Sequence, residues 1–257
     1  MRPENTLPGF EYAIAVGVDA LEMDVMVTRD DVVVVVHDPK LNRAICDAPP
    51  GARAIRQLTF AELSRWDCGS KRNRRFRKQV PEPGARIPSL DQVLALAGRG
   101  SFLFNIEVKC FPDRRGLTPP PEPFAELVYD AICRHKLEKR VMVQSFDFRI
   151  LHVMRRLAPE IRLAALYAGA LKRFVTIARR AETDIVAPHR ALVTARQVSA
   201  AHNSGLKVIT WTANGPREWR RLIAARVDGI ITDNPAALIE YLCEHGLRPQ
   251  APKPAVT

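Results

Sequence analysis

The chain has 257 residues, of which 47% are hydrophobic; this fits one α/β barrel domain, although length alone would also allow two smaller domains. It contains no run of eighteen uncharged apolar residues, and its first ten residues lack the apolar core of a signal peptide, so we expect no membrane span.

The formal charge is +11, and six of the positive charges lie in Lys71–Lys78. That segment has no recognition motif and a single aromatic residue, Phe76, so we interpret it as a solvated loop and expect no nucleic-acid partner.

The cysteines indicate a reducing compartment. They are five in number and scattered, and none forms a Cys-x-x-Cys pair: Cys46, Cys68, Cys110, Cys133 and Cys243. An odd, unpatterned set predicts ordinary reduced thiols, without a disulfide framework or a zinc site. We therefore expect a cytoplasmic protein.

Eight short apolar runs follow one another along the chain, and most are continuously apolar, as in strands that are covered on both faces. The predicted strands are Asp19–Val27, Val32–His37, Phe102–Lys109, Val141–Phe146, Arg162–Tyr167, Asp184–Pro188, Lys207–Thr212 and Gly229–Thr232. Only four residues separate the first two runs, so we interpret these two as a hairpin and not as a crossover.

Amphipathic segments alternate with these strands. Helices are predicted from Thr6 or Asn5 to Gly17, over Leu90–Ala97 after the cap Ser89, over Arg196–Asn203 after the cap Thr194, and over Pro216–Ala225 and Pro235–Glu244. Strands alternating with helices over this length predict a TIM (β/α)8-type barrel. Merging the hairpin leaves seven barrel strands where closure needs eight, so we expect the first barrel strand to be absent from the front of this chain.

We expect one barrel domain over residues 1–245 and a disordered tail over residues 246–257. Two segments interrupt the alternation and are predicted to be surface loops: the basic segment Asp67–Ile87 and the proline-rich segment Phe111–Pro123.

Carboxylates gather at the ends of two predicted strands. Glu22 and Asp24 share one face of the first strand, and Glu107 ends the third, with Lys109 two residues further on the same face. Buried carboxylates are costly unless they are paired or hold a cation. Three carboxylates that converge would suit one Mg²⁺ or Ca²⁺ ion, since both prefer oxygen ligands. Lys109 is then a candidate to neutralise a phosphate oxygen.

Two further residues end predicted strands. His37 closes the second run and is a candidate general acid or base. Trp211 ends the seventh and is a candidate apolar wall for a small substrate. Taken singly, each of these residues is more often structural than functional. Their shared position at the carboxyl ends of strands, where barrel enzymes keep their active sites, favours function.

An ordered set of motifs resembles the glycerophosphodiester phosphodiesterase family. The motifs run across nearly the whole chain: Pro3-Glu4-Asn5-Thr6, Glu22-x-Asp24, His37-Asp38-Pro39, Ile87-Pro88-Ser89-Leu90, Glu107-x-Lys109, Trp211-Thr212-x-Asn214 and Asp228-Gly229-Ile230-Ile231-Thr232-Asp233-x-Pro235. The resemblance implies a metal-dependent barrel hydrolase that cleaves glycerophosphodiesters to an alcohol and glycerol 3-phosphate. It implies that Glu22, Asp24 and Glu107 hold the metal, that His37 is one of two acid–base residues, that Lys109 contacts the phosphate, and that Glu4 supports the site.

The chain departs from the family pattern at its start. The family begins with a short strand ending His-Arg-Gly, which carries the other acid–base histidine and a phosphate-binding arginine, whereas here Met1-Arg2 directly precedes Pro3. We expect either a start assigned too late, which the intact remaining site favours, or a truncated product, and we expect little activity from residues 1–257 as they stand.

Three other functions are alternatives to this hydrolase. They are a non-catalytic barrel that binds phosphodiesters or anions, a nucleic-acid-binding protein, and a related phospholipase acting on intact lipids. The sequence leaves the oligomeric state open.

Overall fold

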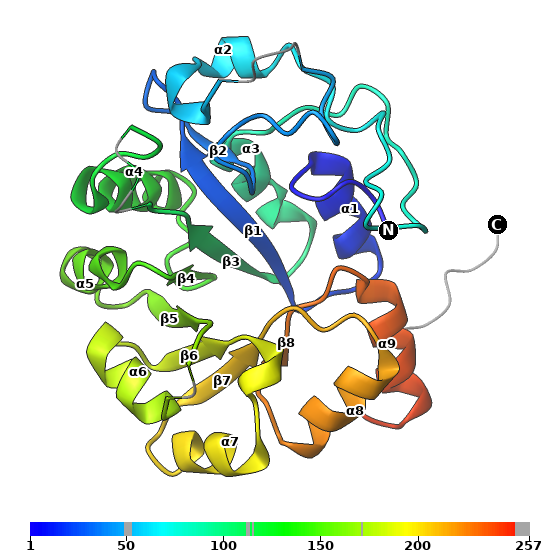
Figure 1. Cartoon of the computed structure of the whole chain (residues 1–257), viewed down its shortest axis with the longest axis vertical. Coiled ribbons are helices and arrows are strands. Elements are labelled where there is room, and N and C mark those ends of the chain that lie inside the picture. The colour runs from blue at the N-terminus through cyan, green and yellow to red at the C-terminus, as the bar shows by residue number, and fades with distance from the viewer. Residues whose placement is uncertain (49–52, 112–113, 115, 171, 250–257) are drawn as a thin grey trace.

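A computed structural model describes residues 1–48, 53–111, 114, 116–170 and 172–249. Eight strands form one sheet in the order β2-β1-β3-β4-β5-β6-β7-β8, and the sheet curls into an arc with helices around its outside (Figure 1). The strands are β1 (Ala20–Val27), β2 (Val33–Val35), β3 (Leu103–Val108), β4 (Val141–Ser145), β5 (Arg162–Tyr167), β6 (Ile185–Pro188), β7 (Lys207–Thr210) and β8 (Gly229–Ile230). Every segment predicted to be a strand contains one.

The pairing of these strands confirms both the hairpin and the open barrel. β2 runs antiparallel to β1 with Val25 opposite Val35, whereas the pairs from β1–β3 to β7–β8 are parallel. Seven strands therefore follow the barrel direction. Within the described ranges no strand pairing joins β8 to β1, so the sheet stays open at the position where an eighth parallel strand would close a barrel.

The helices are α1 (Leu7–Ala15), α2 (Phe60–Leu63), α3 (Leu90–Leu94), α4 (Pro121–Arg134), α5 (Phe148–Leu157), α6 (Phe174–Ala181), α7 (Ala195–His202), α8 (Pro216–Ala224) and α9 (Pro235–Glu244). Three caps were predicted, and each side chain accepts a hydrogen bond from the first turn of its helix: Thr6 in α1, Ser89 in α3 and Thr194 in α7. The helix after Ser89 is shorter than predicted, because the chain tightens into a 3₁₀ turn over Ala95–Arg99.

The helices α4, α5 and α6 fill the crossovers for which no individual helix was predicted. Their apolar residues recur at helical spacing; in α6 the buried ones are Phe174, Ile177, Ala178 and Ala181. Because α4 begins at Pro121, the loop predicted over Phe111–Pro123 ends earlier, at a proline that suits the first turn of a helix. Residues 112, 113 and 115 of that loop lie outside the described residues.

The predicted C-terminal tail falls partly within the structure. Arg248 donates to the carboxylate of Asp19 (2.7 Å) and to the carbonyl oxygen of Gly17 (2.6 Å), so the chain just after α9 is held against the turn that precedes β1. Residues 250–257 lie outside the described residues.

The hydrophobic core has two parts that matter for the site. The larger lies between the outer face of the sheet and the helices and includes the fully buried Phe104, Ile106, Phe124 and Phe174. The smaller lies inside the arc, where Met142, Ala164, Leu166, Ile185 and Ala187 pack with the partly buried Ile209 and Trp211. The interior is thus apolar along β5, β6 and β7.

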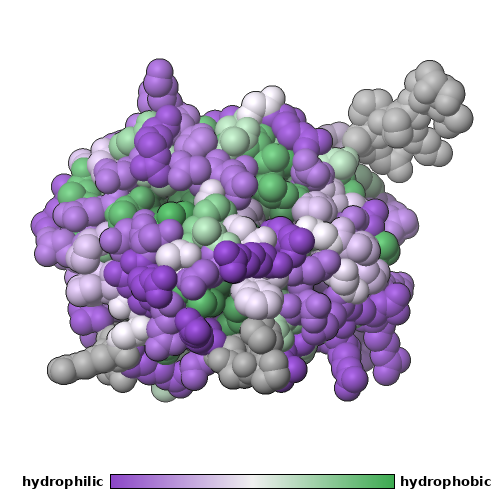
Figure 2. Space-filling view, turned by 90° about the horizontal axis from the view of Figure 1, so that it is seen from above, coloured by the Kyte–Doolittle hydropathy of each residue, from purple (hydrophilic) through white to green (hydrophobic). Residues whose placement is uncertain are grey.

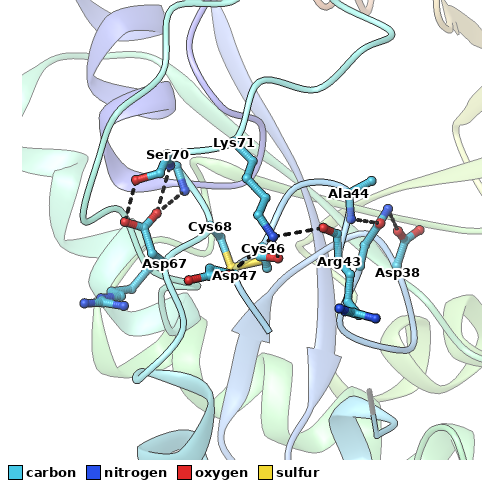
Figure 3. The surroundings of a disulfide bond; sticks show 12 residues. Asp38, Arg43, Ala44, Cys46, Asp47, Asp67, Cys68, Ser70 and Lys71 are labelled. Atoms are coloured by element: carbon cyan, nitrogen blue, oxygen red, sulfur yellow. Dashed lines mark hydrogen bonds and ion pairs between the residues drawn. A yellow bond between two sulfur atoms is a disulfide. The ribbon is translucent and has the colours of Figure 1, made fainter. Parts of the chain in front are cut away.

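The prediction that all cysteines are reduced thiols is wrong. Cys46 and Cys68 form a disulfide between the segment that follows β2 and the segment that follows α2 (Figure 3). The pairing escapes sequence reasoning because no local spacing marks two cysteines 22 residues apart that only the loops bring together. Since disulfides persist mainly in oxidising environments, the cysteines no longer support a reducing compartment.

Asp67, next to this disulfide, organises the loop that follows α2. Its carboxylate accepts hydrogen bonds from the N–H groups of Gly69 (2.8 Å), Ser70 (2.8 Å) and Gly84 (2.7 Å). Desolvation opposes ionisation of this carboxylate, but the donated hydrogen bonds outweigh it and lower the pKa of Asp67 well below its ordinary value. A carboxylate with a depressed pKa stabilises the fold above its unfolded-state pKa, and the contribution disappears as the pH falls through the folded-state value.

Asp67→Asn is therefore expected to cost about 1–2 kcal/mol of the free energy of unfolding at pH 7, where partial exposure to water limits the effect. The difference between the two proteins should shrink as the pH falls below about 4. Urea denaturation at pH 7 and pH 3 checks this. A pH-independent difference would assign the effect to lost packing and not to the charge.

The basic segment Lys71–Lys78 lies on the outside of the molecule. Most of its cationic side chains are exposed, whereas the ring of Phe76 is buried. A buried ring is not available for stacking on a base, which is consistent with a solvated loop; the absence of a nucleic-acid partner stays a prediction. The face in Figure 2 is mainly hydrophilic, with hydrophobic residues in small separate patches. No helix in the described part of the chain is both long enough and apolar enough to cross a membrane.

Candidate active site

The parallel pairing of β1 with β3 brings three predicted metal ligands together. Asp24 stands opposite Glu107, and Glu22 stands one step back along the same face of β1, opposite Asn105. One carboxylate oxygen of each of Glu22, Asp24 and Glu107 lies within 4.8 Å of the other two. The three carboxylates converge on the face that points into the arc, as predicted, but only Glu107 lies near the end of its strand: Asp24 is in the middle of β1 and Glu22 is its third residue, because β1 continues to Val27 to pair with β2.

Lys109 completes the cluster from the residue that follows the end of β3. Its ammonium group donates to Asp24 Oδ1 (3.0 Å) and to Glu107 Oε1 (3.0 Å). The three side chains are about nine-tenths buried, with exposed fractions of 12% for Lys109, 9% for Asp24 and 10% for Glu107. The lysine therefore offsets part of the negative charge in a site from which most water is excluded.

One ammonium group does not balance three carboxylates. Burial, followed by the neighbouring carboxylates, raises the pKa of Glu22 well above its ordinary value and raises that of Glu107 as well. Burial alone would lower the pKa of Lys109, but the charges of Asp24 and Glu107 outweigh it and raise that pKa. The cluster thus favours either bound protons or an additional cation.

The donor set fits a hard divalent cation. All three acidic side chains offer oxygen ligands, the type that Mg²⁺ and Ca²⁺ prefer. Two further oxygens nearby, Asn105 Oδ1 and Gln144 Oε1, are buried and have no hydrogen-bond partner among the described residues, while Gln144 donates its Nε2 proton to Glu22 Oε1 (3.0 Å). Unpartnered buried oxygens beside acidic groups are a natural place for a cation and its water ligands.

His37 lies beside the carboxylates, just beyond the end of β2. Its Nδ1 is 2.8 Å from Asp38 Oδ1, so the ionised aspartate accepts the Nδ1 proton and leaves Nε2 for chemistry. That hydrogen bond opposes the effect of burial and raises the pKa of His37; Asp24 adds to the increase and Lys109 reduces it. A raised pKa keeps the ring protonated to higher pH, which suits a general acid.

Glu4 lines the same pocket as His37 and Asp38. Burial raises the pKa of Glu4, and the nearby charge of His37 partly offsets that increase. The structure therefore places Glu4 at the rim of the site and outside the carboxylate cluster.

Trp211 lies on the opposite wall of the interior, where β7 ends. Its indole N–H donates to the carbonyl oxygen of Ala187 (2.7 Å), which fixes the ring over the apolar interior cluster. Two other rings meet it edge to face: Phe146, with centroids 5.4 Å apart, and His189, with centroids 5.1 Å apart. The site thus has a charged wall on β1 and β3 and an aromatic wall at the ends of β4, β6 and β7.

Three residues of the site were not singled out from the sequence. Asn5 donates to Asp24 Oδ2 (2.9 Å) and accepts from the Asp24 backbone N–H (3.3 Å), Gln144 holds Glu22, and Phe146 extends the aromatic wall. Gln144 could have been found as the polar residue at an inward position of an apolar strand. Asn5 stands in the Pro3-Glu4-Asn5-Thr6 motif but was predicted only as a helix start, and Phe146 gave no such signal, because it is one apolar residue of an apolar run.

Comparison with known proteins adds independent support. Residues 1–237 match the model of the Glycerophosphoryl diester phosphodiesterase family. The chain is 32% identical over 244 residues to a glycerophosphodiester phosphodiesterase of Caldanaerobacter subterraneus subsp. tengcongensis, covering 95% of this chain and 94% of the relative. It is 33% identical over 237 residues to a glycerophosphodiester phosphodiesterase of Bacillus altitudinis, covering 91% and 90%.

Solved structures agree with this. A putative glycerophosphoryl diester phosphodiesterase from Silicibacter pomeroyi superposes with a TM-score of 0.89 and 31% identity, covering 96% of this chain and 90% of that one. A phosphodiesterase of Oleispira antarctica, solved with the product sn-glycerol-3-phosphate, has a TM-score of 0.80 and 23% identity over 94% and 92% of the two chains, which shows a shared fold. The chain accordingly belongs to the glycerophosphoryl diester phosphodiesterase family.

Proposed function

We propose that this protein hydrolyses glycerophosphodiesters to an alcohol and glycerol 3-phosphate, using one divalent cation, Mg²⁺ or Ca²⁺, held by Glu22, Asp24 and Glu107. The observation that carries the proposal is the convergence of these carboxylates with Lys109 on the inner face of the open barrel. Family membership and relatives named for this activity support the same reaction.

Each residue has a defined part in this proposal. The cation, when bound, would offset charge on the phosphoryl oxygens. Lys109 would add a second positive charge beside the same oxygens. Trp211 would give the organic part of the substrate an apolar surface. Glu4, at the rim, would support the charged side of the site.

Net hydrolysis consumes one water: the phosphorus–oxygen bond to the alcohol breaks, a new bond to an oxygen derived from water takes its place, and one proton of the water ends on the released alcohol. In the proposed reaction His37 would donate its Nε2 proton to the leaving alkoxide, while Asp38, 2.8 Å from Nδ1, would hold the Nδ1 proton and stabilise the imidazolium ring. The resemblance to the family implies a second acid–base histidine, on a strand that would precede Pro3.

In a protein extended before Pro3 by a strand ending in His-Arg-Gly, His37→Gln is expected to lower turnover by roughly 10²–10⁴-fold, the usual contribution of one acid–base group. The assay measures glycerol 3-phosphate released from glycerophosphocholine with Mg²⁺ or Ca²⁺ present. His152→Gln is the matched control, because His152 lies on the outer helix α5, where its imidazole ring bonds to the carbonyl oxygen of Arg180 and to no other described residue. Equal losses in both variants would remove His37 from the mechanism.

The runner-up is a barrel that binds phosphodiesters without cleaving them. It would bind glycerophosphocholine in a calorimeter and release no product, even after a complete N-terminal strand is supplied. Product release by any form of the protein would exclude it.

A further inference from the structure

The Cys46–Cys68 disulfide joins two loops that lie beside the proposed active site. Both cysteines are buried, with exposed fractions of 3% for Cys46 and 6% for Cys68. Both residues line one pocket with Glu4, His37, Asp38 and Asn42. Figure 3 shows the bond between the loop that carries Asp38 and the loop that carries Asp67.

The Cys68 side of the bond is firmly anchored. The backbone N–H of Cys68 donates to the carbonyl oxygen of Ala85 (2.8 Å), and the neighbouring Asp67 accepts from Gly69, Ser70 and Gly84. The two sides of this loop are in close contact, since a Cβ atom added to Gly69 would lie 2.0 Å from the carbonyl oxygen of Glu82. Cys68 therefore belongs to a rigid frame.

The Cys46 side leads directly to His37. The backbone N–H of Cys46 donates to the carbonyl oxygen of Asn42 (2.8 Å), and the side-chain amide of Asn42 donates to Asp38 Oδ2 (2.7 Å). The other oxygen of Asp38 lies 2.8 Å from His37 Nδ1. An unbroken series of contacts thus connects the disulfide, the Asn42 turn, the Asp38 carboxylate and the imidazole ring.

We infer that the Cys46–Cys68 disulfide is a redox-sensitive positioning device, which fixes Asn42 and Asp38 so that Asp38 orients His37. The inference rests on the proposed acid–base role of His37. Reduction by a dithiol breaks the sulfur–sulfur bond and yields two thiols, while the dithiol becomes its cyclic disulfide. The Asn42 turn then loses its covalent link to the frame.

After reduction of the disulfide, weaker contacts still hold the loop of Asn42 and Cys46 against the loop of Asp67 and Cys68. Lys71 donates to the carbonyl oxygens of Cys46 (3.1 Å) and Arg43 (3.3 Å), and the N–H of Asp47 donates to the carbonyl oxygen of Asp67 (2.6 Å). Reduction should therefore loosen the Asp38–His37 contact without unfolding the protein. A loosened contact of this kind is expected to lower kcat about tenfold and to leave KM nearly unchanged.

The charged groups around His37 make the titration of its ring a direct reporter of the Asp38–His37 contact. Asp38 and Asp24 raise the pKa of His37, Lys109 lowers it, and Glu4 lies across the same pocket. Asp24, Lys109 and Glu4 lie on β1, after β3 and before α1, so reduction leaves them in place. Only the contribution of Asp38 should weaken, and the pKa of His37 should therefore fall.

The test is the histidine titration of the 257-residue protein by NMR, before and after dithiothreitol, with His37→Gln to assign the resonance. The double variant Cys46→Ser/Cys68→Ser should titrate like the reduced protein and should not respond to dithiothreitol, although Cys110, Cys133 and Cys243 remain. Asn42→Ala, which removes the amide donor to Asp38, should lower the pKa of His37 with the disulfide intact.

Far-UV circular dichroism on the same samples establishes that the barrel remains folded. An identical His37 titration in the oxidised, reduced and double-serine proteins would overturn the inference. The NMR readout does not depend on turnover. A His37 pKa that responds to reduction in a protein without phosphodiesterase activity would therefore defeat the proposed function and leave the positioning inference standing.

Discussion

An N-terminal extension that adds a strand ending in His-Arg-Gly before Pro3 is expected to raise phosphodiesterase turnover roughly 10²–10⁴-fold over that of residues 1–257, the contribution of one acid–base group. The structure provides the place for this strand. β2 pairs with one edge of β1 over Val25–Val27 only, and no strand pairing joins the preceding residues of that edge to β8 in the described chain. A parallel strand there would bring its carboxyl end beside Asp24 and His37.

The matched control is the same extension with glutamine in place of its histidine. Both extensions should raise the melting temperature equally, because both pair with the exposed edge of β1 and cover interior surface. Only the histidine form should raise turnover. A high rate in residues 1–257 alone, or equal rates in the two extended proteins, would show that the second acid–base group lies elsewhere.

Glu107→Gln is expected to abolish detectable binding of Mg²⁺ or Ca²⁺ and to reduce turnover of the extended protein by about 10³-fold or more. The variant removes one of three carboxylates, and the loss of metal-based charge stabilisation is worth several kcal/mol at about 1.4 kcal/mol per factor of ten. Lys109, which bonds both Glu107 and Asp24, would then offset one of the two remaining carboxylate charges, so the cluster would attract a cation less strongly. Isothermal titration calorimetry measures the binding independently of the reaction.

The pH dependence of that binding gives a second check. In the metal-free protein the pKa of Glu107 is raised to about 7, first by burial and then by the charge of Asp24. A cation must therefore displace a proton below that pH, and its affinity should fall as the pH drops from 8 to 6, with protons released on binding.

Glu160→Gln serves as the control for charge, since Glu160 is exposed in the turn between α5 and β5. It should leave affinity and turnover unchanged. Unchanged metal affinity in Glu107→Gln would rule out the carboxylate cluster as the cation site, whatever the effect on turnover.

The sequence alone determined the strands, the hairpin and the number of barrel strands. Continuous apolar runs such as Val32–Val36 are β-branched enough to specify buried strands, and the side-chain caps of Thr6, Ser89 and Thr194 mark helix starts locally. The acidic cluster could also be predicted from the sequence. Alternation puts Glu22 and Asp24 on one face, and parallel strands end at one edge, so Glu107 had to approach them.

Only the tertiary structure decided which contacts the residues in loops make. The Cys46–Cys68 bond, the Asn5–Asp24 contact and the support of His37 by Asn42 through Asp38 all involve irregular segments, whose conformation carries no period that a sequence reveals. The same holds for the balance of charge around Lys109, because its exposure and its two carboxylate partners set the pKa values of the site. Local patterns fix which residues form strands and helices, whereas long-range packing fixes which side chains meet and how much water reaches them.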